Sequence, residues 1–210
     1  MLRRILCIVS VILSLNYFAL AHSHIYVGIN VDGISNTGDE NRLCIFGMPA
    51  IIEMLPTGDY LGGKQIYIGE IDCWHSAEHD TPYQLDDNSQ QSNWQISLKR
   101  INYSDPVNFW MEDEATTLEI LLSDSATYAF NEPGWDDDEG WHFHNHIEFL
   151  ASADGAEQAF SATFTVFDTG LTGFIESSQY TLNFVTVPEP ASFAIFGTGL
   201  FSILKLRRKQ

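Results

Sequence analysis

The chain has 210 residues and is strongly acidic, because 28 aspartates and glutamates stand against 10 lysines and arginines, a formal net charge of −18. Six of the ten basic residues lie in the first four or the last six positions, so the long central part keeps only Arg42, Lys64, Lys99 and Arg100. This charge excludes nucleic acid and anionic membrane surfaces as partners of the central part, and it favours cations.

The N-terminal segment has the three parts of a secretory signal peptide. Arg3 and Arg4 provide a positive start, residues 5–15 form an apolar stretch, and an A-L-A pattern ends at Ala21. The apolar stretch is short for a membrane-spanning helix, which needs about 20 residues. We therefore predict that residues 1–21 are a signal peptide, which signal peptidase removes after Ala21.

Residues 22–187 form the exported part, which is long enough for one domain with its own core. With four basic and 27 acidic residues, this domain carries a formal charge of −23. Its two cysteines, Cys44 and Cys73, are predicted to form a disulfide, because exported proteins meet an oxidising environment. Closing that loop would contribute about 3–4 kcal/mol to stability. The alternative makes Cys73 and His75 soft metal ligands.

Apolar and polar residues alternate along many short segments of this domain, which is typical of half-buried strands. Turn-forming sequences separate these segments, for example at residues 56–59 and 168–170, and no segment keeps a helical period. Strands are expected in "HIYVGINV", "KQIYIGEI", "NWQISLKRI", "VNFWM", "TLEILL", "ATYAF", "AFSATFTVF" and "QYTLNFV". We predict an all-β fold for residues 22–187, a single β-sandwich of immunoglobulin-like or jelly-roll type, with an exposed loop at residues 75–93.

The segment "GWHFHNHIEFLA" places histidines on every second position of one predicted strand. Alternate side chains of a strand share a face and lie about 6.6–6.8 Å apart along it. Phe143, Ile147 and Phe149 are expected to face the core, with Asn145 as the odd polar member. The opposite face then carries a stripe of four candidate metal ligands, namely His142, His144, His146 and Glu148.

Two adjacent histidines of this stripe can bind one metal ion, because neutral imidazole is a favoured ligand for zinc, copper and nickel. A third histidine, about 13 Å from the first, does not easily reach the same ion. The stripe therefore indicates one site completed from elsewhere or two sites that share the middle histidine; the alternative is a plain polar face. If the first strand lies beside the stripe, His24 completes a tetrahedral zinc site. Alternatively, the mature N-terminus, beginning at His22, wraps copper or nickel through its amine.

The C-terminal segment "VPEPASFAIFGTGLFSILKLRRKQ" joins Pro188, Glu189 and Pro190 to a short apolar stretch and a basic tail. A positive flank after an apolar stretch is typical of a stop-transfer helix. Residues 188–210 closely resemble the PEP-CTERM sorting signal of bacterial exported proteins. The resemblance implies that an exosortase recognises and removes this tail, that the protein contacts the membrane only through it before processing, and that the product reaches the cell surface or an exopolysaccharide matrix.

A second resemblance rests on "FHNHIEF" and on the strands "AFSATFTVF" and "QYTLNF" that follow it. These segments are similar to the end of a PEP-CTERM family that is repressed by the zinc-uptake regulator. The correspondence assigns its histidine and acidic element to His144, His146 and Glu148, and its N-terminal histidine to His22 or His24. It covers the first strand and the last 50 residues or so, and it implies a surface protein that holds zinc and is made when zinc is scarce.

The patterns together predict an exported, non-catalytic protein that binds zinc, or copper or nickel in its place, in metal scavenging or buffering. An enzyme is not expected, because the chain has no G-x-S-x-G motif, no paired nucleophilic cysteine and no phosphate loop. The alternative is a structural protein that associates with matrix polysaccharide, with tryptophans as stacking platforms. The acidic run at residues 136–139, flanked by Trp135 and Trp141, can equally take calcium through oxygen ligands.

Overall fold

A computed structural model describes residues 23–29, 41–75, 94–130, 134–136, 140–155, 157–170 and 172–187. At positions 23–24, 74–75, 134–136 and 140–142 it defines the backbone alone. The predicted signal peptide, most of the predicted loop at 75–93 and the predicted membrane segment in residues 188–210 lie outside these ranges. None of the described residues belongs to a helix that is long and apolar enough to cross a membrane.

Within these ranges the chain forms twelve strands and no helix. The strands are β1 (Ser23–Ile29), β2 (Leu43–Phe46), β3 (Ile52–Leu61), β4 (Lys64–His75), β5 (Ile96–Tyr103), β6 (Phe109–Asp113), β7 (Leu118–Ile120), β8 (Thr127–Ala129), β9 (Gly134–Asp136), β10 (Gly140–Ala153), β11 (Ala159–Asp168) and β12 (Tyr180–Thr186). The predicted all-β class is confirmed. Every segment predicted as a strand corresponds to one of the twelve.

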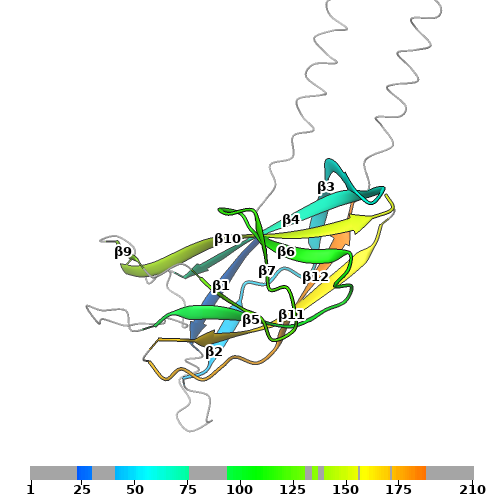
Figure 1. The fold of residues 1–210 in the computed structure, drawn as a ribbon. Helices are drawn as coiled ribbons and strands as arrows, with labels where there is room; N and C mark the ends of the chain where they lie inside the picture. Colours follow the sequence, from blue (N-terminus) through cyan, green and yellow to red (C-terminus); the bar gives the residue numbers. More distant parts are fainter. Residues whose placement is uncertain are drawn as a thin grey trace, which may run out of the picture.

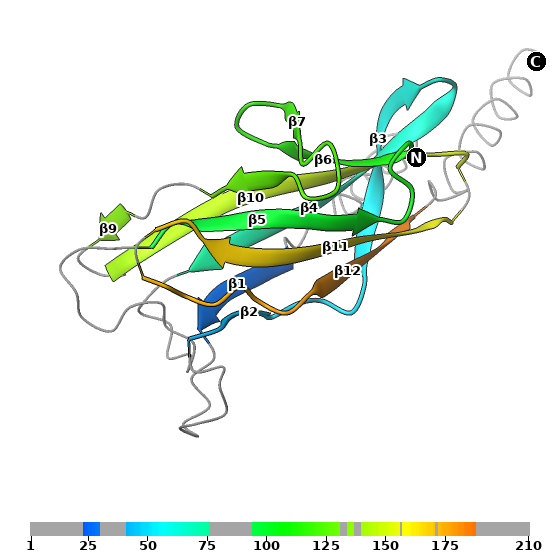
Figure 2. The same ribbon diagram turned by 60° about the horizontal axis from the view of Figure 1, so that its bottom comes forward.

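Hydrogen bonds connect the strands into one mixed sheet with the order β7-β6-β10-β4-β3-β12-β11-β5-β8 (Figures 1 and 2). Strands β1 and β2 branch from this path, because β1 pairs with the end of β4 that β3 leaves uncovered, and β9 pairs with the start of β10. The pairs β1–β4 and β3–β12 are parallel, and the other pairs are antiparallel. Strand β10 thus lies in the middle of the β6-β10-β4 layer, with a partner on each side.

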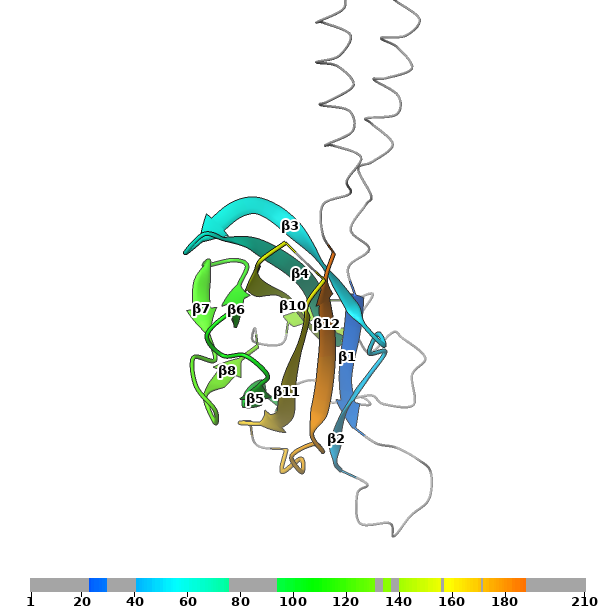
Figure 3. The same ribbon diagram turned by 90° about the vertical axis from the view of Figure 1, so that its right-hand side faces the viewer.

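Figure 3 shows that the sheet curves round on itself. The core that it encloses is rich in phenylalanine. Phe149 of β10 lies 4.6 Å from Phe184 of β12 and 5.9 Å from Phe164 of β11, measured between ring centroids. Phe109 of β6 stacks 5.2 Å from Phe160 of β11. These rings come from opposed parts of the same sheet, so the inward face of β10 is fixed by packing from across the core. On β11 the alternate residues Phe160, Ala162, Phe164 and Val166 are all buried.

The structure corrects one predicted turn. Residues 56–59 lie inside β3, where the pairing with β4 shifts register between Pro56 and Tyr60. The chain reverses instead at Gly62 and Gly63, whose φ angles are 60° and 88°. A two-residue hairpin loop with both φ angles positive matches the right-handed twist of the flanking strands, and glycine adopts it without steric cost.

The predicted disulfide is also wrong, because Cys44 and Cys73 are both free. Cys44 pairs with Gly28 on one side of β1, while Cys73 pairs with Ile25 on the other side. Two strand spacings of about 4.8 Å each already exceed the Cα–Cα distance that a disulfide spans. Cys73 is fully buried in the core, on the face opposite to the exposed histidines, so the structure also contradicts its proposed role as a soft metal ligand beside His75.

Both thiols should therefore be unreactive in the folded protein. Burial raises the pKa of Cys44 to about 11, and it raises the pKa of Cys73 further. Because the thiolate is the nucleophile, we expect iodoacetamide to modify both residues slowly at pH 8 and rapidly after unfolding. A reducing agent should leave the melting temperature unchanged. Mass spectrometry that finds an intact 44–73 disulfide in the exported protein would contradict the arrangement of β1, β2 and β4.

A polar contact inside the curved sheet explains Asn145, the odd inward-facing residue of β10. Its amide donates to Tyr128 Oη of β8 at 3.5 Å, and Tyr128 in turn donates to the Asp113 carboxylate at the end of β6. This hydrogen bond is the largest cause of the lowered pKa of Asp113. The contact joins β8, at one end of the strand order, to β6 near the other end, so Asn145 is a partner in closing the sheet.

Replacing Tyr128 with phenylalanine should lower the free energy of unfolding by about 1–2 kcal/mol at pH 7, because the variant loses a hydrogen bond to a charged group. The folded pKa of Asp113 is depressed, so this stability is present above about pH 4 and is lost as the carboxyl protonates. Denaturant unfolding of both proteins measures the difference. An equal difference at pH 7 and pH 3 would show that the charge of Asp113 does not contribute.

Candidate metal centre

The alternation predicted for the histidine stripe is confirmed where side chains are defined. On β10, Phe143, Asn145, Ile147 and Phe149 are buried, whereas the side chains of His144 and His146 are 43% and 47% exposed. The two rings lie on the outer face of the sheet, with their centroids 4.4 Å apart. The outward pair is therefore held in place by the inward packing of its neighbours along the same strand.

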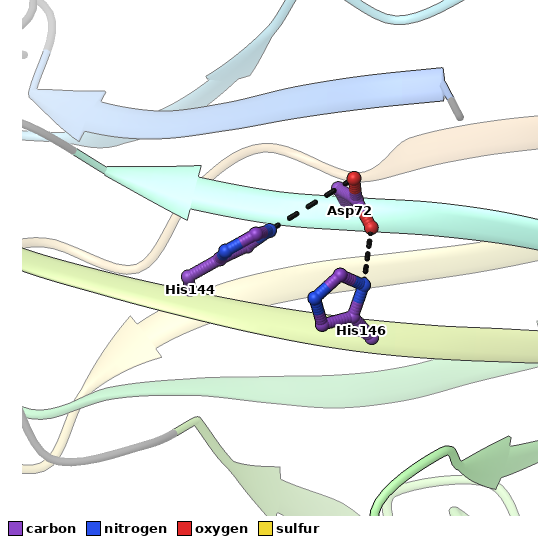
Figure 4. A group of neighbouring side chains, drawn as sticks. All are labelled: Asp72, His144 and His146. Atoms are coloured by element: carbon purple, nitrogen blue, oxygen red, sulfur yellow. Dashed lines mark ion pairs between the residues drawn. The ribbon is translucent and has the colours of Figure 1, made fainter. Parts of the chain in front are cut away.

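Asp72 of β4 completes a group with these two histidines (Figure 4). The antiparallel register places Asp72 directly opposite His146. His146 Nδ1 lies 2.7 Å from Asp72 Oδ1, and His144 Nε2 lies 3.9 Å from Asp72 Oδ2. The Asp72 side chain is only 6% exposed. The group therefore combines one buried carboxylate with two exposed imidazole rings.

One ligand atom from each residue, an imidazole nitrogen or a carboxylate oxygen, lies within 4.8 Å of the other two. Such atoms can approach one cation placed between them. Nitrogen and oxygen donors of this kind suit zinc, and imidazole also suits copper and nickel. The adjacent H-x-H pair thus converges as predicted, and the completing residue from elsewhere is Asp72.

The other predicted ligands are placed differently. His142 lies on β10 opposite Gly134 of β9, and its side chain is not among those defined. His24 of β1 pairs in parallel with Asp72 of β4, and β4 in turn pairs with β10. The prediction that the first strand lies directly beside the stripe is therefore wrong, because β4 lies between them. His22 lies outside the described residues. Its role and that of His24 remain predictions.

Glu148, the fourth member of the predicted stripe, belongs to a different group. It pairs with Glu70 of β4 and with Glu112 of β6, and Glu112 pairs with Glu119 of β7. These registers put four glutamates in one row across four strands. Burial raises the pKa of Glu148 above its usual range, and repulsion from Glu114, Glu70 and Glu112 raises it further.

The basic side chains of the domain make contacts away from this row. Lys64 donates to Asn108, Lys99 forms an ion pair with Glu176, and Arg100 pairs with Asp124. Arg42 donates to the carbonyl oxygen of Glu176. The carboxylates of this row, next to the Asp72–His144–His146 group, create a negative potential, which raises the local concentration of cations.

Sequence reasoning missed Asp72, although one signal for it was present. In "KQIYIGEIDCWH", Asp72 is in phase with Glu70, so its place on the outer face can be read from the alternation. Its pairing with His146 cannot be read from the sequence, because neither strand shows its register with a strand more than 60 residues away.

Among known families, the PEP-CTERM protein-sorting motif matches residues 186–209. The chain ends in a PEP-CTERM sorting signal. The protein is therefore exported to the cell surface or matrix, is transiently anchored in the membrane by its C-terminal segment, and is processed by an exosortase. The matched residues are those of the sorting signal alone, so the similarity to zinc-regulated PEP-CTERM proteins remains a prediction.

The similarity to solved structures is remote. The N-terminal domain of PorA is 11% identical with a TM-score of 0.35, and the match covers 77% of this chain and 96% of that one. A mutant of the enterotoxigenic E. coli adhesin CfaE is 11% identical with a TM-score of 0.32, covering 79% of this chain and 49% of that one. No curated protein sequence matches this chain significantly.

The buried carboxylate makes a distinct prediction. Asp72→Asn keeps the shape of the side chain and removes its charge, so it should weaken zinc binding by at least about 10-fold. Glu70→Gln removes one charge from the same strand, two residues before Asp72, and should reduce the zinc affinity much less. Competition with a chromophoric zinc chelator measures both affinities. Equal losses for the two variants would show that Asp72 acts only through the general potential.

Proposed function

We propose that the exported domain binds a transition-metal ion, with zinc as the first candidate, through Asp72, His144 and His146. The observation that carries this proposal is the mutual approach of their ligand atoms to within 4.8 Å. The group also joins two features that metal sites need. A buried carboxylate fixes one donor, and the two exposed imidazoles remain accessible to an ion from solvent.

The composition of the group suits zinc and disfavours copper(I). It offers two imidazole nitrogens and one carboxylate oxygen, and no thiolate takes part, because Cys73 faces the core. Zinc accepts such mixed ligands in tetrahedral geometry, whereas the softer copper(I) prefers sulfur. Copper(II) and nickel(II) are competitors for the same imidazoles, so they belong in the test.

Scavenging or buffering of metal at the cell surface is the role that fits this placement. The sorting signal takes the protein out of the cell, and the surrounding carboxylates attract cations toward the exposed rings. We infer a binding protein rather than an enzyme. Association with matrix polysaccharide stays an alternative, supported by the sorting signal and by the partly exposed Trp110, whose indole donates to Glu112 at 2.7 Å.

The mature exported protein should bind one zinc ion per group at pH 7.5, measured by isothermal titration and by competition with a chelator. Binding should weaken as the pH falls, because protons compete with the metal for the imidazole nitrogens. Changing both His144 and His146 to alanine should abolish this binding. The same titrations with copper(II) and nickel(II) rank the metals.

The double change Thr163→Ala and Thr181→Ala removes two hydroxyls that contact each other on β11 and β12, away from the group, so it serves as the control and should bind like the unchanged protein. Retention of zinc affinity by the double variant would remove the proposal. So would a mature protein that gives no heat and leaves the chelator loaded.

A further inference from the structure

A second carboxylate approaches His146 from the strand on its other side. Glu114 Oε2 lies 3.4 Å from His146 Nδ1, the same nitrogen that lies 2.7 Å from Asp72 Oδ1. Asp72 comes from β4 and Glu114 directly follows β6, so one carboxylate reaches His146 from the side of each of these two neighbouring strands. His146 is therefore flanked on both sides by candidate oxygen donors.

The turn that carries Glu114 is well anchored. Asp113 Oδ1 accepts hydrogen bonds from the backbone and the hydroxyl of Thr116, at 2.9 and 3.1 Å. The backbone N–H of Thr117 donates to the Asp113 carbonyl at 2.8 Å, and Thr117 has a left-handed φ of 53°. The Glu114 side chain is 52% exposed on this fixed backbone, so it can rotate toward an ion without moving the sheet.

The number of protein ligands decides what a zinc site does. Three ligands leave the fourth position to water, as in catalytic sites, whereas four ligands close the tetrahedron, as in sites that only hold the ion. Asp72, His144 and His146 make three. A fourth from Glu114 would close the set with two carboxylates, whose charges together neutralise a divalent cation.

We propose that Glu114 is the fourth ligand and closes the site around a divalent cation. This inference rests on the metal binding proposed above. It adds the number of protein ligands, four, and the class of ion, a divalent cation. The donor set, two imidazoles and two carboxylates, suits divalent ions of the zinc kind and disfavours copper(I). Because no position stays open for water, the site holds the ion and does not activate a nucleophile.

Two other residues near the group have to be distinguished from Glu114 in the test. His24 pairs with Asp72 from the far side of β4, so it is the alternative fourth ligand. Glu119 lies on the same hairpin as Glu114 and is exposed as well, but its register partner is Glu112. Glu119 therefore provides a matched control. Replacing it removes one negative charge from the same hairpin and leaves the proposed ligand Glu114 unchanged.

The test compares Glu114→Gln with Glu119→Gln in the mature exported protein, with zinc affinity measured by chelator competition. Glu114→Gln should weaken zinc binding by about 10- to 100-fold or more, since even an outer partner of a ligand contributes that much. Glu119→Gln should change it by less than about 3-fold, because exposed charges farther away are screened. Cobalt(II) loaded in place of zinc should show an absorption spectrum that Glu114→Gln alters and Glu119→Gln does not, as water replaces the carboxylate.

The outcomes separate this inference from the function on which it rests. If the unchanged protein binds no zinc, the proposed function fails. If it binds zinc tightly and both glutamine variants behave alike, Glu114 is not a ligand and the proposed function stands. If His24→Ala weakens binding and Glu114→Gln does not, the fourth ligand is His24 and the inference is overturned. Unchanged unfolding curves for Glu114→Gln confirm that its loss is local.

Discussion

The antiparallel ladder between β4 and β10 determines where the candidate metal centre lies. It pairs eleven residues in succession, from Phe143 with His75 to Ala153 with Gln65, and it places Asp72 opposite His146. A slip of one residue would turn the histidines toward the core, and a slip of two would bring Glu70 or Trp74 opposite His146. The geometry of the candidate metal centre therefore depends on the register of a single strand pair.

Packing across the core holds that register. The inward residues of β10 include Phe143 and Phe149, which contact rings from distant segments, among them Trp94, Phe164 and Phe184. These contacts are lost if β10 shifts, so the apolar face of the strand positions the polar face. Asn145 contributes from the same inward face, because its contact with Tyr128 takes part in closing the curved sheet.

The outer face of the sheet around the candidate metal centre is strongly acidic. Glutamates in register across β4, β10, β6 and β7 repel one another. The raised pKa of Glu148 reflects its burial first and this repulsion second. The domain has only four basic side chains to offset its acidity, and these bond elsewhere. A bound cation would relieve the repulsion, which links the proposed function to the stability of the outer face. The sorting signal carries this acidic face to the outside of the cell.

The sequence by itself determined the C-terminal sorting signal, the all-β class and the outward pairing of His144 and His146, because each depends on a local pattern or on the two-residue period of a strand. Local alternation also explains why Phe143 and Ile147 could be assigned to the core. Only the tertiary structure decided that Asp72 joins the histidines, that Glu148 belongs to a separate acidic row, that β4 separates His24 from β10, and that Cys44 and Cys73 stay apart. These outcomes depend on which strands become neighbours and in which register. Strand neighbours are selected by packing between residues far apart in the chain, and no single segment contains that information.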